Sequence, residues 1–157
     1  MPGILFICTG NLFRSPLAAA FFRQRLQQDG QEEHWSIDSA GTWTLPGQSV
    51  PAVMQQAAEK RGIHLEKHLS KLVDASLLDS FDLVLVMESG HKEALNVEFP
   101  SAASKIFLLP QVVDGVKYDV PDPAITGQDA EQVAADMSSL IERGYERICQ
   151  LATSLQS

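Results

Sequence analysis

Short apolar runs alternate along this chain with longer segments in which apolar residues recur every three or four positions. A short apolar run bounded by turn residues is typical of a buried strand, and the longer recurrence is typical of a helix that packs on one face. The sequence predicts strands at 4–8, 36–40, 81–87 and 105–109. It predicts helices at 15–28, 51–62, 91–97 and 129–155. This order predicts an α/β domain with a doubly wound, four-stranded parallel sheet.

The segment 81–87 and the final helix carry the clearest patterns. Residues 81–87 are almost all apolar, as expected of a strand buried on both faces of a parallel sheet. The final helix has one apolar face, which consists of Val133, Met137, Leu140, Ile141, Tyr145, Ile148 and Ala152. Residues 110–127 are instead rich in Pro, Gly and Asp, which predicts a long loop.

The helix boundaries follow from capping residues. We expect Ser15 to cap the first helix, with Pro16 at its first position. Ser49 is expected to cap the next helix, which begins near Pro51 and ends at Gly62. Four parallel strands with a ligand loop after the first fit a flavodoxin-like order. That order places the site at the carboxyl ends of the strands.

Composition and charge narrow the possible partners. The chain has 157 residues, 45% of them hydrophobic, which is enough for a single domain, residues 1–157, with its own core. Its net charge of −8 makes binding to nucleic acid or an anionic membrane unfavourable. The N-terminal residues do not form a basic segment followed by a long apolar one, so we expect no signal peptide. The apolar runs are also too short to span a bilayer.

The most informative residues lie directly after the first strand, where Cys8 and Arg14 enclose five residues. So short a loop between strand and helix turns several backbone N–H groups toward one point, and the helix N-terminus adds its positive end, which favours an anion. The same donors, with Arg14, favour the thiolate form of Cys8. A thiolate in a phosphate-binding loop is suited to attack phosphorus, which predicts a phosphatase. The alternative is a buried structural Cys8 with Arg14 on the surface.

The sequence Cys8-Thr9-Gly10-Asn11-Leu12-Phe13-Arg14-Ser15-Pro16 resembles the signature loop of the low-molecular-weight protein tyrosine phosphatases, in the bacterial type of that family. Other blocks follow in family order, namely Ser39-Ala40-Gly41-Thr42, His68, 81–87 and Asp122-Pro123. The resemblance implies hydrolysis of phosphotyrosine in proteins through a phosphocysteine. It implies no metal and no other cofactor.

Three residues are expected to carry the reaction. Cys8 attacks phosphorus, and the planar fork of Arg14 binds two phosphoryl oxygens and holds the transition-state charge. The resemblance implies that Asp122 is the general acid that protonates the leaving oxygen and later activates water. By itself an Asp in a Pro-rich segment is more often a turn residue, and Asp119 competes with it. Its place in family order before the final helix favours Asp122.

The resemblance also implies roles for residues around the loop. Asn11, Ser39 and His68 brace it by hydrogen bonds, with Asn11 in a left-handed backbone conformation. The hydroxyl of Ser15 assists Cys8 as a leaving group. The residues expected to contact the phosphate or the substrate are Thr9, Gly10, Asn11, Leu12, Phe13, Ser15 and Trp43.

Four side chains allow more than one interpretation. Trp43 is expected to be an exposed pocket wall, and the alternative is ordinary core packing. His64 and His68 have the spacing of a metal pair, but no third ligand has suitable spacing, so we expect no metal. Cys149, near the apolar face of the last helix, is expected to be a small buried hydrophobe.

The sequence departs from the family at the loop and at the pocket wall. Many members have a second cysteine just before the arginine, where this chain has Phe13, so Cys8 lacks a protective disulfide. Ala124-Ile125-Thr126 replace the aromatic residues that commonly follow the catalytic Asp-Pro. The block 87–95 resembles the branch that dephosphorylates protein arginine, but that branch has Thr where this chain has Leu12, which favours phosphotyrosine.

These observations predict a protein-tyrosine-phosphatase, with protein arginine phosphatase as the alternative. An arsenate reductase would need a further reactive thiol, and a catalytically inactive phosphate-binding module would not need the whole catalytic set. A thiol nucleophile requires a reducing compartment, which favours the cytoplasm. The expected partner is a phosphorylated protein, such as the tyrosine kinases of polysaccharide export that the bacterial resemblance implies.

Overall fold

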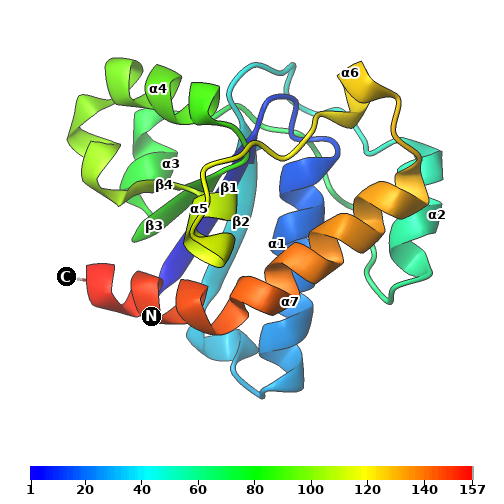
Figure 1. Cartoon of the computed structure of the whole chain (residues 1–157), viewed down its shortest axis with the longest axis horizontal. Helices are drawn as coiled ribbons and strands as arrows, with labels where there is room; N and C mark the ends of the chain where they lie inside the picture. The colour runs from blue at the N-terminus through cyan, green and yellow to red at the C-terminus, as the bar shows by residue number, and fades with distance from the viewer. Residues whose placement is uncertain (157) are drawn as a thin grey trace.

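Four parallel strands form the sheet at the centre of the computed structural model, which describes residues 1–156 (Figure 1). The strands are β1 (Gly3–Cys8), β2 (Ser36–Gly41), β3 (Leu83–Val86) and β4 (Ile106–Leu108). Their order in the sheet is β2-β1-β3-β4, and all neighbouring pairs are parallel. The predicted α/β fold with a doubly wound, flavodoxin-like sheet is therefore confirmed.

Helices cover both faces of the sheet. One face carries α1 (Arg14–Gln28), α2 (Ala52–Glu59), α5 (Leu109–Asp114) and α7 (Ala130–Leu155). The other carries α3 (Ala75–Asp79) and α4 (Ser89–Glu98). The remaining short helices are α6 (Pro123–Thr126) and the 3-10 segments Glu32–His34 and Pro100–Lys105. Among the residues that the structure describes, no helix combines the length and the apolar character that crossing a membrane requires.

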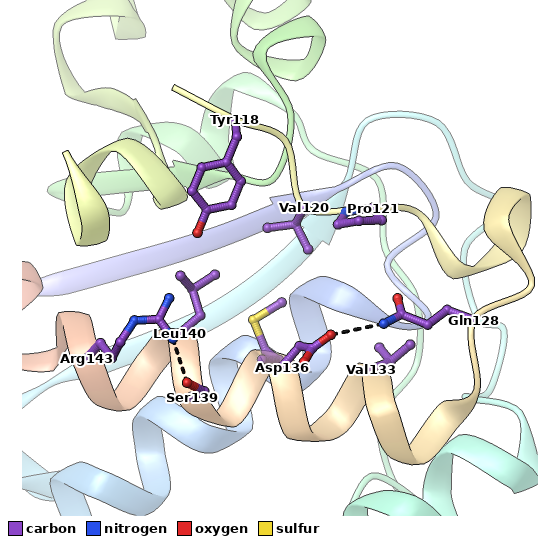
Figure 2. Close-up of a pocket in the computed structure, with 10 residues that line it drawn as sticks. Tyr118, Val120, Pro121, Gln128, Val133, Asp136, Ser139, Leu140 and Arg143 are labelled. Carbon is purple, nitrogen blue, oxygen red and sulfur yellow. Dashed lines mark hydrogen bonds between the residues drawn. The ribbon is translucent and has the colours of Figure 1, made fainter. Parts of the chain in front are cut away.

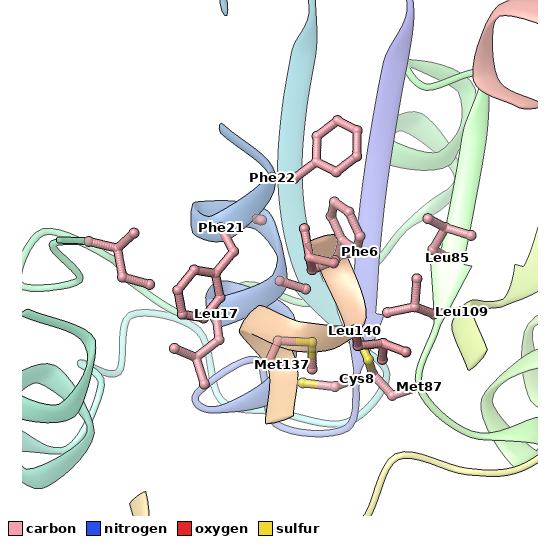
Figure 3. Packing of buried hydrophobic residues seen from close by; sticks show 14 of the residues in the cluster. Phe6, Cys8, Leu17, Phe21, Phe22, Leu85, Met87, Leu109, Met137 and Leu140 are labelled. Carbon is pink, nitrogen blue, oxygen red and sulfur yellow. The ribbon is translucent and has the colours of Figure 1, made fainter. Parts of the chain in front are cut away.

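Strand β1 divides its side chains between the two cores. Phe6 and Cys8 pack in the larger cluster under α1 and α7, whereas Leu5 and Ile7 pack in the smaller cluster under α4. This alternation is the period of two of a strand. Figure 3 shows Cys8 among apolar side chains of the larger cluster, with Met137 of α7 nearby. The predicted apolar face of α7 is confirmed, because all seven of its residues are buried.

The capping predictions at two helices are wrong. Helix α1 already begins at Arg14 after Phe13, and no side chain caps it. The hydroxyl of Ser15 is instead occupied inside the loop, as described below. Helix α2 begins at Ala52 after Pro51 and ends at Glu59, so Ser49 is not its cap.

The prediction of a long loop over 110–127 is also wrong, because two short helices lie within it. Proline stands in the first turn of each helix, and each ends at a left-handed glycine, Gly115 (φ 72°) or Gly127 (φ 69°). Proline and glycine here mark helix starts and ends rather than open loop. The sequence analysis also missed α3, a helix of five residues.

Candidate active site

The loop between β1 and α1 closes around the sulfur of Cys8. The backbone N–H of Asn11 donates to Cys8 Sγ at 3.3 Å, and the Ser15 hydroxyl lies 3.0 Å from the same sulfur. Cys8 is only 2% exposed. A sulfur that is surrounded by hydrogen-bond donors at a helix N-terminus is suited to carry negative charge.

Asn11 holds the loop in this shape. Its φ of 57° is left-handed, as expected. Its side-chain amide donates to Ser15 Oγ (2.8 Å) and Ser39 Oγ (3.0 Å), and its Oδ1 accepts from the backbone N–H of Lys71 (3.0 Å). Its backbone carbonyl lies 2.8 Å from His68 Nε2. Asn11, Ser39 and His68 thus form the contacts from which bracing was expected.

The ring of His68 is the donor in its contact with Asn11. A carbonyl oxygen can only accept, so Nε2 must carry a proton. Partial burial lowers the pKa of His68, which favours the neutral ring with that single N–H. Nε2 of His68 is thus engaged at the loop, whereas His64 lies near Glu59 and Glu66.

Gly41, at the end of β2, is a residue whose importance the sequence analysis missed. A Cβ at this position would lie 2.5 Å from the carbonyl oxygen of Thr9 and 3.2 Å from the Cβ of Asn11. The two segments are joined beside it, where Thr42 N donates to Cys8 O (2.9 Å) and Trp43 N donates to Thr9 O (3.0 Å). Only glycine lets the chain approach the loop this closely.

The guanidinium of Arg14 is almost completely buried, with 2% of its side chain exposed. Its Nη1 donates to Glu88 Oε2 (2.6 Å) and to the carbonyl of Val120 (2.9 Å). Its Nη2 donates to Thr9 Oγ1 (3.3 Å) and lies 3.5 Å from Asp122 Oδ2. Contacts from several elements fix the plane of the fork. Both Nη atoms are engaged by protein acceptors, so an oxyanion that binds the fork would replace some of these contacts.

Glu88 and His91 are site residues that the sequence analysis did not identify. Glu88 follows the carboxyl end of β3 and forms an ion pair with Arg14. His91 Nε2 lies 2.8 Å from Thr9 Oγ1 and 3.6 Å from Glu88 Oε2. The rule that ligands bind at the carboxyl ends of parallel strands could have pointed to both residues.

The two candidate acids have different surroundings. Asp119 Oδ1 accepts from the backbone N–H and the hydroxyl of Ser89 (2.8 and 2.9 Å), so it is engaged at the start of α4. Asp122 Oδ1 accepts from Ala124 N (3.0 Å), and its other oxygen faces Arg14. The structure therefore brings Asp122 to the edge of the phosphate-binding loop, as expected.

The expected substrate wall is placed only in part. Trp43 is 83% exposed and so is not a core residue, and Ile125 of α6 is 85% exposed. Leu12 is half-buried in the loop, and a Cβ at Gly10 would meet no atom within 4 Å. Phe13 packs against the larger core cluster, which limits its use as a substrate contact. The loop thus offers Leu12 and an open backbone at Gly10 to a ligand.

A separate cavity of about 260 Å³ lies between the segment that leads to Asp122 and helix α7. Figure 2 shows Tyr118, Val120 and Pro121 on one side of it and Leu140 and Arg143 of α7 on the other. In the described part of the chain, neither Cys8 nor Arg14 lines this cavity. It adjoins the site around the sulfur through Val120, whose carbonyl accepts from Arg14.

Cys149 is half-buried on α7 rather than fully buried as expected. Burial raises its pKa to about 11, so it remains a thiol at neutral pH. Glu59, His64 and Glu66 have ligand atoms within 4.8 Å of one another, but all three side chains are exposed. Such a surface group is common without an ion and lies apart from the residues described above.

Sequence comparison places the chain among known proteins. The family model described as low molecular weight phosphotyrosine protein phosphatase matches residues 3–157. A protein-arginine-phosphatase of Geobacillus stearothermophilus is 34% identical over 146 residues, covering 92% of this chain and 95% of the relative. The low molecular weight protein-tyrosine-phosphatase YfkJ of Bacillus subtilis is 33% identical over 160 residues, covering 99% and 97%.

Solved structures agree with the sequence matches. A crystal structure of a YwlE mutant from Bacillus subtilis has a TM-score of 0.86 at 29% identity, covering 95% of this chain and 99% of that one. A YwlE arginine phosphatase in which cysteine is mutated to serine, with a phosphorylated active site serine, has a TM-score of 0.83 at 30% identity, covering 98% and 95%. Fold, loop and relatives agree, and the chain belongs to the low molecular weight phosphotyrosine protein phosphatase family.

Proposed function

We propose that this protein is a phosphatase that hydrolyses phosphotyrosine in proteins through a phosphocysteine. The observation that carries the proposal is the buried sulfur of Cys8 inside a loop of donors, with Arg14 and Asp122 at its edge. In the first step, Cys8 Sγ bonds to phosphorus, the bond from phosphorus to the tyrosine oxygen breaks, and Asp122 protonates that oxygen. In the second step, Asp122 takes a proton from water, the water oxygen bonds to phosphorus, and Cys8 leaves as a thiolate.

Ser15 has the position to assist the second step. Its hydroxyl lies 3.0 Å from Cys8 Sγ, and Asn11 donates to its oxygen at 2.8 Å. The Ser15 hydroxyl hydrogen has two acceptors within reach, Cys8 Sγ at 3.0 Å and the carbonyl oxygen of Ala40 at 3.4 Å, and a thiolate that forms at the shorter distance would attract it. A donor in this place stabilises the thiolate as the bond between sulfur and phosphorus breaks.

Asp122→Asn is expected to lower kcat about 100-fold for a phosphotyrosine peptide, since an amide cannot donate the proton that the leaving oxygen needs. Steady-state kinetics on that peptide measure the effect. Asp119→Asn is the matched control: it preserves an acceptor oxygen for Ser89, and we expect kcat to stay within a few fold of the wild-type value. Equal losses in the two variants would contradict the assignment of the acid to Asp122.

Phosphoarginine is the alternative substrate. The identity of 34% with a protein-arginine-phosphatase and the short side chain of Ala124 beside Asp122 favour it. Leu12 in the loop favours phosphotyrosine, because an aliphatic side chain packs well on an aryl ring. We give Leu12 the greater weight because it belongs to the loop that surrounds the sulfur.

The choice is tested with kcat/KM on matched peptides that differ only in phosphotyrosine or phosphoarginine. We expect the wild type to prefer phosphotyrosine. We expect Leu12→Thr to lower that preference about tenfold, since it removes apolar contact with the ring. A wild-type preference for phosphoarginine would retain the mechanism and reject the substrate assignment.

Two rival functions receive less support. An arsenate reductase needs a second reactive thiol at the site, but Phe13 occupies the loop position, and Cys149 is a half-buried thiol with a raised pKa. An inactive binding module has no use for the full set of Cys8, Arg14 and Asp122. We place the enzyme in the reducing cytoplasm, with phosphorylated proteins, including tyrosine kinases, as partners and no role for nucleic acid or membrane.

A further inference from the structure

The hydroxyl of Thr9 lies between two groups of the site. His91 Nε2 is 2.8 Å from Thr9 Oγ1, and Arg14 Nη2 donates to the same oxygen at 3.3 Å. His91 is 6% exposed, and Arg14 is 2% exposed. The buried contacts of Arg14 and His91 give Thr9 Oγ1 a fixed place directly after Cys8.

The proton on His91 can be assigned to Nε2. Burial lowers the pKa of His91, so the ring is neutral at neutral pH and carries one N–H. The buried Nδ1 has no hydrogen-bond partner in residues 1–156. If Nδ1 carried the proton, it would be a buried donor without an acceptor. If Nε2 carries the proton, it can donate to Thr9 Oγ1, and Glu88 Oε2 lies 3.6 Å from the same nitrogen.

This assignment determines what the Thr9 hydroxyl can do. A hydroxyl oxygen accepts two hydrogen bonds, and here His91 and Arg14 supply both. The hydroxyl hydrogen is therefore used by neither contact and is left for a third group. Asp122 Oδ2 lies 3.5 Å from the same Arg14 Nη2 that donates to Thr9 Oγ1. The hydroxyl and the proposed general acid thus share one nitrogen of the guanidinium, and Thr9 follows Cys8 directly in the loop.

We propose that His91 is a positioning residue that fixes the Thr9 hydroxyl as a hydrogen-bond donor to a phosphoryl oxygen of the bound substrate. The proposal rests on the phosphatase function proposed above. Thr9 is not a nucleophile in this arrangement. A serine-type triad places the carboxylate on the other ring nitrogen, whereas Glu88 lies beside Nε2 and pairs with Arg14.

The test is a double-mutant cycle. Thr9→Val removes the hydroxyl at nearly constant shape, and His91→Leu removes the ring that directs it. We expect each to lower kcat about tenfold with little change in KM, because a hydrogen bond to an oxyanion strengthens as charge develops. If His91 acts through Thr9, the double variant is no slower than the single variants.

Conservative variants separate this role from a structural one. Thr9→Ser retains the hydroxyl, and His91→Gln places an amide N–H near the position of Nε2, so both are expected to recover most of kcat. Equal Tm values within the set would exclude loss of fold as the cause. Losses that multiply in the double variant, or an unchanged kcat in Thr9→Val, would overturn the proposal.

Two further measurements test the role of Thr9 separately from the phosphatase function. Rates are measured on a small aryl phosphate, and the affinity for orthovanadate is measured in parallel. A wild type that hydrolyses the aryl phosphate supports the phosphatase function whatever Thr9→Val does. If the wild type were inactive, orthovanadate binding about tenfold weaker in both Thr9→Val and His91→Leu would still support the Thr9 hydroxyl as a hydrogen-bond donor. Unchanged binding would reject that role.

Discussion

Replacing Cys8 by serine is expected to lower kcat by about 10⁴-fold or more while leaving the affinity for inorganic phosphate within about tenfold of the wild-type value. The sulfur is the nucleophile of the proposed reaction, and a hydroxyl in its place is a far weaker one at neutral pH. The loop itself should persist, because a serine oxygen can accept from Asn11 N and contact Ser15 as the sulfur does. Single-turnover kinetics and titration with inorganic phosphate measure the two quantities.

Mass spectrometry of the Cys8→Ser variant after exposure to substrate adds a second readout. A slow transfer that stops at the first step would leave phosphate on the substituted side chain. The YwlE relative with a phosphorylated active site serine shows that such a state exists in that enzyme. A phosphate found at position 8 would mark this residue as the point of attack.

Cys149→Ser is the matched control for the Cys8 substitution. Cys149 is half-buried on α7, and burial keeps it protonated, so its loss should leave kcat within about twofold. If Cys8→Ser kept substantial turnover, the sulfur would not be the nucleophile. If Cys149→Ser abolished turnover, a two-thiol mechanism would replace the one proposed here.

Replacing Arg14 by lysine is expected to lower kcat about 10³-fold for a phosphotyrosine peptide. An ammonium cannot present the planar fork that contacts Glu88, Val120 and Thr9 at once. The lysine would also form a weaker ion pair with the partly buried carboxylate of Glu88. We therefore expect a loss of about 1–3 kcal/mol in the free energy of unfolding, measured by urea denaturation.

The control for Arg14 is the same substitution elsewhere on α1. Arg25 lies on an exposed part of that helix, where it pairs with Glu142 and Asp29. Surface pairs of this kind contribute little, so Arg25→Lys should leave kcat unchanged. A kcat for Arg14→Lys within tenfold of wild type would show that a positive charge suffices and that the fork is not required.

Local patterns predicted the four strands, the main helices and the loop between β1 and α1. The apolar run before Cys8 and the helix after it are contiguous in sequence, so their geometry depends on residues close to one another along the chain. The predictions failed where local signals have two meanings. Proline and glycine in 110–127 could indicate loop or helix ends, and only the packed chain shows α5 and α6 there. Ser15 could cap a helix or contact Cys8, and it does the latter.

The sequence by itself determined the α/β order and the short loop between Cys8 and Arg14, because periodicity and a five-residue loop are local properties. The tertiary structure decided what surrounds Arg14. Glu88 and the carbonyl of Val120 reach the guanidinium from 74 and 106 residues away along the chain, and His91 reaches Thr9 from 82 residues away. Such contacts depend on the exact register of the strands and on how loops and helices pack at the edge of the sheet, which no local pattern encodes.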